Sequence, residues 1–185
     1  ITKSLFCSVV PVKFLLIKSF IHKNFKCKCV ELKNLNLRKV MKINVNNKQV
    51  GSDRLANSLA VISNKHNHII LDFGTATTFD VVIGNKYLGG LIAPGVSISL
   101  NTLINKASLI PSVDLKKIKK VIGKNTVSAV RSGFFWGYVG LINNIIKLIQ
   151  KETKKSFRII ITGGFSKIFV NSLDFKVTVD RDITL

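Results

Sequence analysis

The stretch IILDFGTATTFDVVI, Ile69–Ile83, decides the fold prediction, because two apolar runs enclose a short polar segment. Runs of this length that are rich in isoleucine, valine and phenylalanine are typical of β-strands. Gly74 allows the backbone to turn sharply between them. We therefore predict a β-hairpin with strands at 69–73 and 77–83, and with Asp72 at the end of the first strand.

The periodicity of apolar residues and the positions of glycine and proline predict the remaining elements. Strands are expected at 4–12, 25–32, 40–46 and 157–164, with an extended segment at 176–185 and loops at 44–53 and 89–95; helices are expected at 12–23, 53–64, 96–110 and 125–153. Pro11 is expected to end the first strand. Strands and helices alternate after Gly51, which indicates an α/β fold with a mixed sheet.

The length and composition restrict the class of protein. The chain has 185 residues, of which 46% are hydrophobic, so it can form one domain with a core or two small lobes and is not a disordered tail. The run at 12–21 is short and contains two lysines, and we expect a buried element there and no bilayer-spanning segment.

The net charge of +20 has two interpretations. A nucleic-acid or anionic-membrane partner would use such a charge. Alternatively, lysine supplies 24 of the 29 basic residues, a composition that AT-rich codons produce by drift. The lysines are scattered, the dense run at 116–120 is typical of a solvated surface, and arginine does not alternate with aromatic residues as in base-stacking surfaces. The pattern favours drift, and we expect neither a nucleic-acid nor a membrane partner.

Three cysteines do not form a disulfide framework. Cys27 and Cys29 alternate as in a strand and should face one side. A metal site with His22 is conceivable, but one C-x-C pair without a second ligand pair is weak evidence. Free thiols in a reducing cytoplasm fit the composition better.

The tip of the predicted hairpin has the residue types of a phosphate site. Gly74 lets a ligand approach the backbone, and successive backbone N–H groups at such a turn can bind phosphate oxygens. Thr75, Thr77 and Thr78 add hydroxyl groups, and Asp72 is placed to hold a cation. These groups together suit phosphoryl transfer from a nucleotide. An ordinary hairpin with polar turn residues would explain the same stretch.

Two further glycine segments favour the nucleotide interpretation. Gly89–Gly95 follows an apolar strand, and Gly163 and Gly164 end another. The carboxyl ends of strands are where α/β proteins usually bind ligands. Taken with residues 72–75, these segments predict a nucleotide cleft.

The segment VGSDRLAN places Asp53 and Arg54 where a loop enters a helix. One interpretation is an N-capping aspartate followed by an exposed arginine. The other is a carboxylate that takes a proton from a hydroxyl group, beside a guanidinium that holds an anionic substrate. The segment alone leaves both open.

Six motifs occur in the order in which type III pantothenate kinases carry them: SVVP, VGSDRLAN, LDFGTATTFDVV, YLGGLIAPG, GKNTVSAVRSG and ITGGF. The closing VDRDITL is also similar to that family, so the resemblance extends from Ser8 to Leu185. It implies an RNase H-like, two-lobed actin/Hsp70-type kinase fold with mixed sheets, shared with acetate and sugar kinases, in which ATP binds between the lobes. The expected lobes are 1–65, carrying the substrate loop, and 66–185.

The resemblance also implies an activity and its residues. ATP phosphorylates pantothenate to 4′-phosphopantothenate, the first step of coenzyme A biosynthesis, with Mg²⁺ and a monovalent cation, K⁺ or NH₄⁺. The implied proton acceptor is Asp53, and the implied substrate contacts are Gly51, Ser52, Arg54 and, across a homodimer, Thr126. The implied ATP contacts are Gly74, Thr75, Gly163 and Gly164, and the implied ligand of the monovalent cation is Asp72.

The chain departs from the family pattern at its beginning. The family's opening Asp-x-Gly-Asn-Thr phosphate loop is not found, and the sequence ends inside the last motif. We therefore expect an incomplete N-terminal lobe and a fragment or decayed copy with little or no activity, since positioning and electrostatics supply most of the catalysis. Two other functions stay open: a non-catalytic regulator that resembles Bvg accessory factors and binds nucleic acid, and a kinase for another small hydroxylated substrate.

Overall fold

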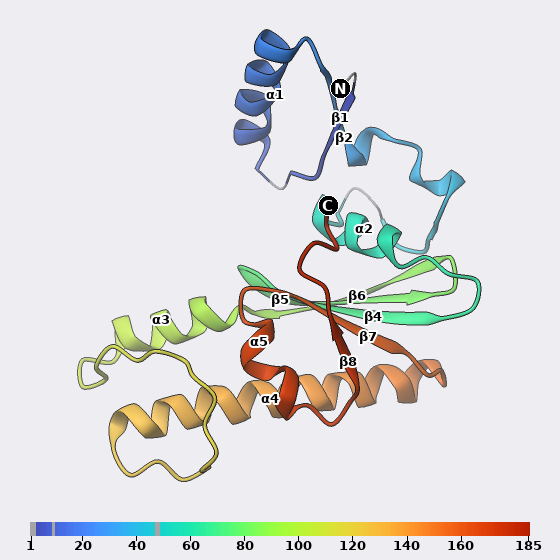
Figure 1. The fold of residues 1–185 in the computed structure, drawn as a ribbon. Coiled ribbons are helices and arrows are strands. Elements are labelled where there is room, and N and C mark those ends of the chain that lie inside the picture. The colour runs from blue at the N-terminus through green and yellow to red at the C-terminus, as the bar shows by residue number, and fades with distance from the viewer. Residues whose placement is uncertain (1–2, 9, 47–48) are drawn as a thin grey trace.

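The computed structural model describes residues 3–8, 10–46 and 49–185. A small N-terminal unit stands apart from the larger body of the molecule (Figure 1). It consists of β1 (Lys3–Phe6), α1 (Pro11–Phe25) and β2 (Lys28–Glu31). The strands β1 and β2 pair in parallel, with α1 as the connection between them.

The larger body is built on a six-stranded mixed sheet in the order β3-β6-β5-β4-β7-β8. The strands are β3 (Lys42–Ile43), β4 (Asn67–Phe73), β5 (Ala76–Ile83), β6 (Lys86–Pro94), β7 (Arg158–Gly163) and β8 (Val177–Val179). The strands β4, β5 and β6 form an antiparallel meander, whereas β7 pairs in parallel with β4 and β8. The predicted hairpin and the mixed α/β architecture are confirmed. Because β3 pairs with β6, residues on both sides of the expected 65/66 lobe boundary share this sheet.

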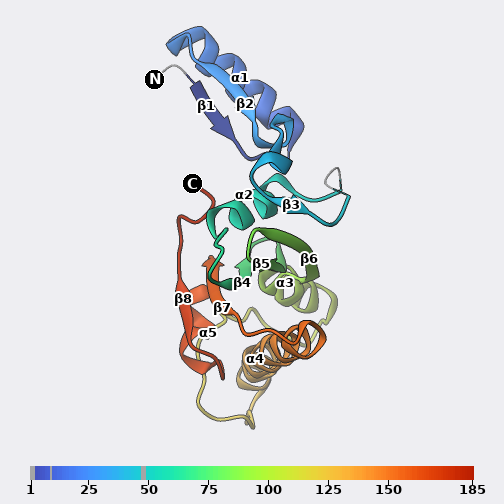
Figure 2. The ribbon, with the colours of Figure 1, turned by 90° about the vertical axis from the view of Figure 1, so that its right-hand side faces the viewer.

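Helices cover both faces of the sheet (Figure 2). One face carries α2 (Ser52–Ala60), and the other carries α4 (Thr126–Thr153), with α3 (Val96–Lys106) beside α4 and the short α5 (Ser166–Phe169) near β8. The start of α4 is defined by a capping box, in which Asn125 accepts a hydrogen bond from the Ser128 N–H and Ser128 reciprocates. Single 3₁₀ turns lie at Leu32–Asn34, Leu37–Lys39 and Val170–Ser172.

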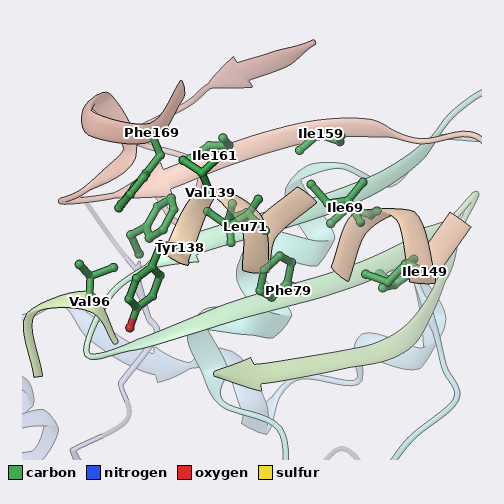
Figure 3. Packing of buried hydrophobic residues seen from close by; sticks show 14 of the residues in the cluster. Ile69, Leu71, Phe79, Val96, Tyr138, Val139, Ile149, Ile159, Ile161 and Phe169 are labelled. Atoms are coloured by element: carbon green, nitrogen blue, oxygen red, sulfur yellow. The ribbon is translucent and has the colours of Figure 1, made fainter. Parts of the chain in front are cut away.

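Alternation along β4 divides the core between the two faces. Ile69 and Leu71 pack against α4 in one cluster (Figure 3). Ile70 packs on the opposite side with Leu55 of α2 and Val82 of β5. Even-numbered residues of β4 and β5 therefore face α2, which places their polar members next to the first turns of that helix.

Three local predictions were wrong. The run at 12–21 is not a buried element, because Leu15, Leu16 and Phe20 of α1 are each more than half exposed. Pro11 does not end a strand but begins α1, since proline suits the first helical position, where its missing N–H costs no hydrogen bond; β1 already ends at Phe6. The segment 89–95 is not a glycine-rich loop, because β6 continues to Pro94. Within β6, Gly89 has φ 118° and lies where the pairing register with β5 shifts.

Other elements are shorter than predicted. The strand expected at 40–46 is reduced to β3, the helix expected to reach 110 ends at Lys106, and the extended segment 176–185 contributes only β8. Val9, within the first predicted strand, and residues 47–48, within the predicted loop 44–53, lie outside the described residues. Within the described ranges, no helix is long and apolar enough to cross a membrane.

Candidate functional site

The first turn of α2 carries the residues that the sequence analysis assigned to substrate. Gly51 is the N-cap of α2, and Asp53 lies in the first turn, where the helix dipole favours a carboxylate. The backbone N–H of Arg54 donates to Asp53 Oδ1 over 2.9 Å. Ser52 is fully buried, and its hydroxyl oxygen lies 2.9 Å from Glu31 Oε1 and 3.1 Å from the Ser8 carbonyl oxygen. The Ser52 side chain therefore ties α2 to the N-terminal unit.

Arg54 is not an exposed arginine beside a capping residue. Its side chain is only 13% exposed, and its Nε donates to Asp80 Oδ1 over 2.8 Å. The Tyr87 hydroxyl donates to the same oxygen over 2.7 Å. Asp80 is fully buried in β5, so this ion pair joins α2 to the middle of the sheet.

Asp72 lies near the end of β4 on the face that α2 covers. Asn57 Nδ2, from α2, is 3.5 Å from Asp72 Oδ2, and the Asn57 Oδ1 accepts a 2.6 Å hydrogen bond from the Thr184 hydroxyl. Burial raises the pKa of Asp72, the charge of Asp53 raises it further, and the Asn57 contact offsets part of this rise. Asp80 adds a smaller effect that also raises the pKa of Asp72.

This electrostatic environment fits a bound cation. Three carboxylates, Asp53, Asp72 and Asp80, influence one another, and the field they create would be relieved by positive charge near Asp72. In the part of the chain that the structure describes, no three His, Cys, Asp or Glu side chains are grouped to hold a metal ion. A cation at Asp72 would therefore take most of its ligands from backbone, water or a bound phosphate. Cys27 and Cys29 are both buried free thiols, and Lys28 between them is exposed, which agrees with the prediction that the two cysteines face one side.

The glycine segments meet at the hairpin tip. The Gly74 N–H donates to the Ala76 carbonyl over 3.1 Å, and the Gly164 N–H donates to the Phe73 carbonyl over 3.1 Å. Gly163 has φ 85°, and a Cβ there would lie 2.7 Å from Asp72 Oδ1. Gly163 and Asp72 are thus brought together, but the N–H groups of Gly74 and Gly164 are already engaged within the protein.

The exposed turn residue Thr75 lies beside the start of α3. A Cβ on Gly95, the N-cap of α3, would be 2.0 Å from the Thr75 carbonyl oxygen, so glycine allows this close approach. Thr77 does not join the tip, because its side chain is completely buried. Its hydroxyl therefore cannot serve as the phosphate contact considered for it from the sequence.

Thr126 is the first residue of α4 and is exposed. Since α4 and α2 cover opposite faces of the sheet, Thr126 does not join Asp53 within one chain (Figure 2). The substrate contact expected of it across a homodimer stays a prediction.

Sequence reasoning missed Asp80, Tyr87 and Asn57 as members of this site. A signal for Asp80 was present: an acid within the apolar run 79–83, in a chain with only nine acidic residues. Tyr87 and Asn57 gave a weaker signal: each lies in a family motif, YLGGLIAPG and VGSDRLAN, but a tyrosine in a strand and an asparagine in a helix are ordinary residues there.

The sequence model of a family described as type III pantothenate kinase matches residues 1–148. A type III pantothenate kinase of Pelagibacter ubique is 65% identical over 185 residues, which are all of this chain and 75% of that protein. The Paramagnetospirillum magneticum type III pantothenate kinase is 37% identical and aligns with the whole chain and 72% of its own length. The solved structure of a Baf family protein from Campylobacter jejuni superposes with a TM-score of 0.67 at 19% identity, covering 100% of this chain and 78% of that one.

These matches confirm the resemblance that the six motifs indicated, and the Campylobacter structure confirms the fold alone, because its sequence identity is low. A match of the family model over most of the chain, together with relatives that align over the whole chain at 65% and 37% identity, is sufficient for assignment. The chain belongs to the type III pantothenate kinase family.

Proposed function

We propose that the protein transfers the terminal phosphoryl group of ATP to pantothenate and so makes 4′-phosphopantothenate for coenzyme A biosynthesis. The observation that carries this proposal is the arrangement around the first turn of α2, where the charge of Asp53 acts on Asp72 and on the buried Arg54–Asp80 pair. This arrangement offers a proton acceptor, a fixed cationic group and an anionic site for a cation within one side of the sheet.

Each side chain has a separate role in the proposed reaction. Asp53 accepts the proton of the pantothenate hydroxyl group as that oxygen attacks phosphorus. Arg54 holds the anionic end of pantothenate, Gly51 and Ser52 shape the loop around it, and Thr126 of a second copy of the chain closes the site. The ATP phosphates lie at the hairpin tip, against Gly74, Thr75, Gly163 and Gly164.

The proposed reaction also uses two cations. Mg²⁺ accompanies ATP, and a monovalent cation, K⁺ or NH₄⁺, is held by the Asp72 carboxylate. Their chemical contribution is positive charge that offsets the negative charge of the phosphates. Asp72 suits this role because its carboxylate lies at the strand end, next to the Gly163 backbone.

Replacement of Asp72 by asparagine is expected to stabilise the fold in the absence of cations. The raised pKa of Asp72 means that its ionised form opposes folding at pH values above the unfolded-state pKa. The stabilisation is therefore largest near neutral pH and disappears as the pH falls towards about 4, where the unfolded carboxyl group is protonated. Because solvent screens a half-buried carboxylate, we expect a rise in melting temperature of about 2 °C at pH 7.

Thermal denaturation at several pH values, with and without KCl at constant ionic strength, checks this expectation. K⁺ should stabilise the unsubstituted protein and leave the Asp72→Asn variant unchanged. A variant that is less stable at pH 7, or one that still responds to K⁺, would contradict the proposed cation site.

The homodimer part of the proposal is supported by an apolar groove between α3 and α4. It has a volume of about 410 Å³ and is lined by Pro94, Ser99, Leu103, Val130, Gly133, Phe134, Gly137, Tyr138 and Leu141. A Cβ at Gly137 would meet nothing within 4 Å, so we expect the fold to tolerate a substitution there. Gly137→Arg is expected to convert a dimer to a 20.5-kDa monomer in sedimentation velocity, whereas Gly140→Arg, also in open space but outside the groove, should not.

A direct assay tests the proposed reaction: ADP release by the longest native form of the protein, with ATP, Mg²⁺ and K⁺, and with pantothenate present or omitted. Pantothenate-dependent release is expected. Release that another small hydroxylated compound supports equally well would favour the alternative kinase.

The regulator alternative is not favoured. The Campylobacter protein is described as a transcriptional activator, but at 19% identity the structural match supports a shared fold and not a shared activity. A protein that only bound nucleic acid would have no use for a buried ion pair beside Asp53. The three free cysteines support the cytoplasm as the proposed location.

A further inference from the structure

We propose that Asp80 and Tyr87 are positioning residues that orient the guanidinium of Arg54 towards the anionic group of the substrate. The inference rests on the proposed function, in which Arg54 holds pantothenate. It assigns a task to two residues of the site that act through Arg54 and do not themselves contact the substrate.

The contacts define which edge of the guanidinium is used. Asp80 Oδ1 accepts from Arg54 Nε at 2.8 Å and lies 2.7 Å from Nη2. Nε and Nη2 form one edge of the planar group, so this edge is committed to Asp80 and Nη1 lies on the opposite side. A guanidinium held along one edge has its plane fixed, and its outer edge can then meet a carboxylate in a defined orientation.

Tyr87 fixes the position of the Asp80 carboxylate, which in turn binds Arg54. Its hydroxyl donates to Asp80 Oδ1 over 2.7 Å, and both side chains are completely buried. The same oxygen thus receives donors from α2 and from β6, and the carboxylate cannot rotate without breaking one of them. Burial, and then the charge of Asp80, raise the pKa of the Tyr87 phenol, so this hydroxyl keeps its proton as a donor at all physiological pH values.

Gly90 of β6 lies beside Nη2 of Arg54. A Cβ at Gly90 would lie 1.8 Å from the Phe79 carbonyl oxygen and 2.8 Å from Arg54 Nη2. The β6 backbone therefore passes directly beside the guanidinium. Arg54 is confined between Asp80 and β6 and cannot move away from the first turn of α2.

Burying the Asp80 carboxylate costs more desolvation free energy than a purely structural contact would require. Asp80 Oδ2 is buried and has no hydrogen-bond partner among the described residues, so one carboxylate oxygen is desolvated without compensation. Apolar residues of similar size often stabilise a fold as well as a buried ion pair does. A role in fixing Arg54 for binding explains why this position carries a charge.

The test compares Asp80→Asn and Tyr87→Phe with the unsubstituted protein through two readouts. The first is the ¹⁵N-NMR signal of the Arg54 Nε–H, assigned by its loss in Arg54→Lys. Slow hydrogen exchange is expected for the unsubstituted protein, and exchange at least about tenfold faster for Asp80→Asn, because the charged acceptor is lost. Tyr87→Phe should show a smaller acceleration, and a surface control, Asp174→Asn, should show none.

The second readout separates KM from kcat. Asp80→Asn is expected to raise the KM for pantothenate about tenfold or more with kcat changed less than about threefold, since binding and not proton transfer is affected. A fall in kcat at unchanged KM, or unchanged Arg54 exchange in Asp80→Asn, would overturn the positioning role. Circular dichroism of each variant establishes that it is folded.

Failure of the kinase assignment would look different. In that case the unsubstituted protein would show no pantothenate-dependent turnover and no shift of the Arg54 signal on titration with pantothenate. Faster exchange in Asp80→Asn would still support the orientation of Arg54 by Asp80, and unchanged exchange would still refute it.

Discussion

Replacing Asp53 by asparagine is expected to lower pantothenate-dependent ADP release by about 10²–10⁴-fold, the usual contribution of a positioned general base. Asparagine keeps the shape of the side chain and an oxygen that can accept from the Arg54 N–H, but it cannot take a proton. The loss should appear in kcat, with KM for pantothenate little changed, because Arg54 and its partner Asp80 stay in place.

The measurement is steady-state ADP release by the longest native form of the protein, since the 185 residues alone are expected to have little or no activity, at saturating ATP, Mg²⁺ and K⁺ with pantothenate varied. Asp174→Asn is the matched control: it removes an exposed carboxylate that pairs with Lys147 on the surface, where an ion pair contributes little. Activity of Asp53→Asn within threefold of the unsubstituted protein would exclude Asp53 as the proton acceptor.

Gly163→Ala is expected to produce the largest loss of stability, about 2–4 kcal/mol in the free energy of unfolding, from backbone strain together with steric overlap. Gly163 has φ 85°, which an L-residue adopts only with strain, and the added Cβ would lie 2.5 Å from the Phe73 carbonyl oxygen. Relief of that overlap would push β7 away from the end of β4. Asp72 would move as well, so the stabilisation by K⁺ should be lost.

The neighbouring glycine supplies the control. A Cβ at Gly164 would meet nothing within 4 Å, and Gly164→Ala is expected to change the unfolding free energy by less than about 0.5 kcal/mol. Urea denaturation of both variants under identical conditions makes the comparison. Equal stability of the two would mean that the close approach of β7 to Phe73 is not a constraint on this fold.

Local sequence patterns were sufficient for the elements that form the site. The two strands of the hairpin, the turn at Gly74, the helix after Gly51 and the long helix that begins after Asn125 were all predicted from residue periodicity and the positions of glycine. These features depend on neighbours within a few positions, which a sequence displays directly. The same residues carried the family motifs, so membership in the type III pantothenate kinase family was also available from the sequence.

Local sequence patterns gave wrong predictions at residues that are compatible with two different local backbone structures. Pro11 is compatible with the end of a strand and with the first turn of a helix, and the chain adopts the second, with Pro11 as the first residue of α1. Gly89 and Gly90 suggested a loop because glycine is weak in strands, yet the backbone of β6 must pass Phe79 and Arg54 too closely for any side chain at Gly90.

What the sequence by itself determined was therefore the set of elements, the family and the placement of Asp53 at the start of a helix. Tertiary structure alone decided the partners: Arg54 meets Asp80 from 26 positions away, and Asn57 meets Thr184 from 127 positions away. The first of these pairs depends on strand register, because a shift of one residue would turn Asp80 towards α4 and leave Arg54 without its carboxylate. Register is a property of the assembled sheet, and no short segment of the chain contains it.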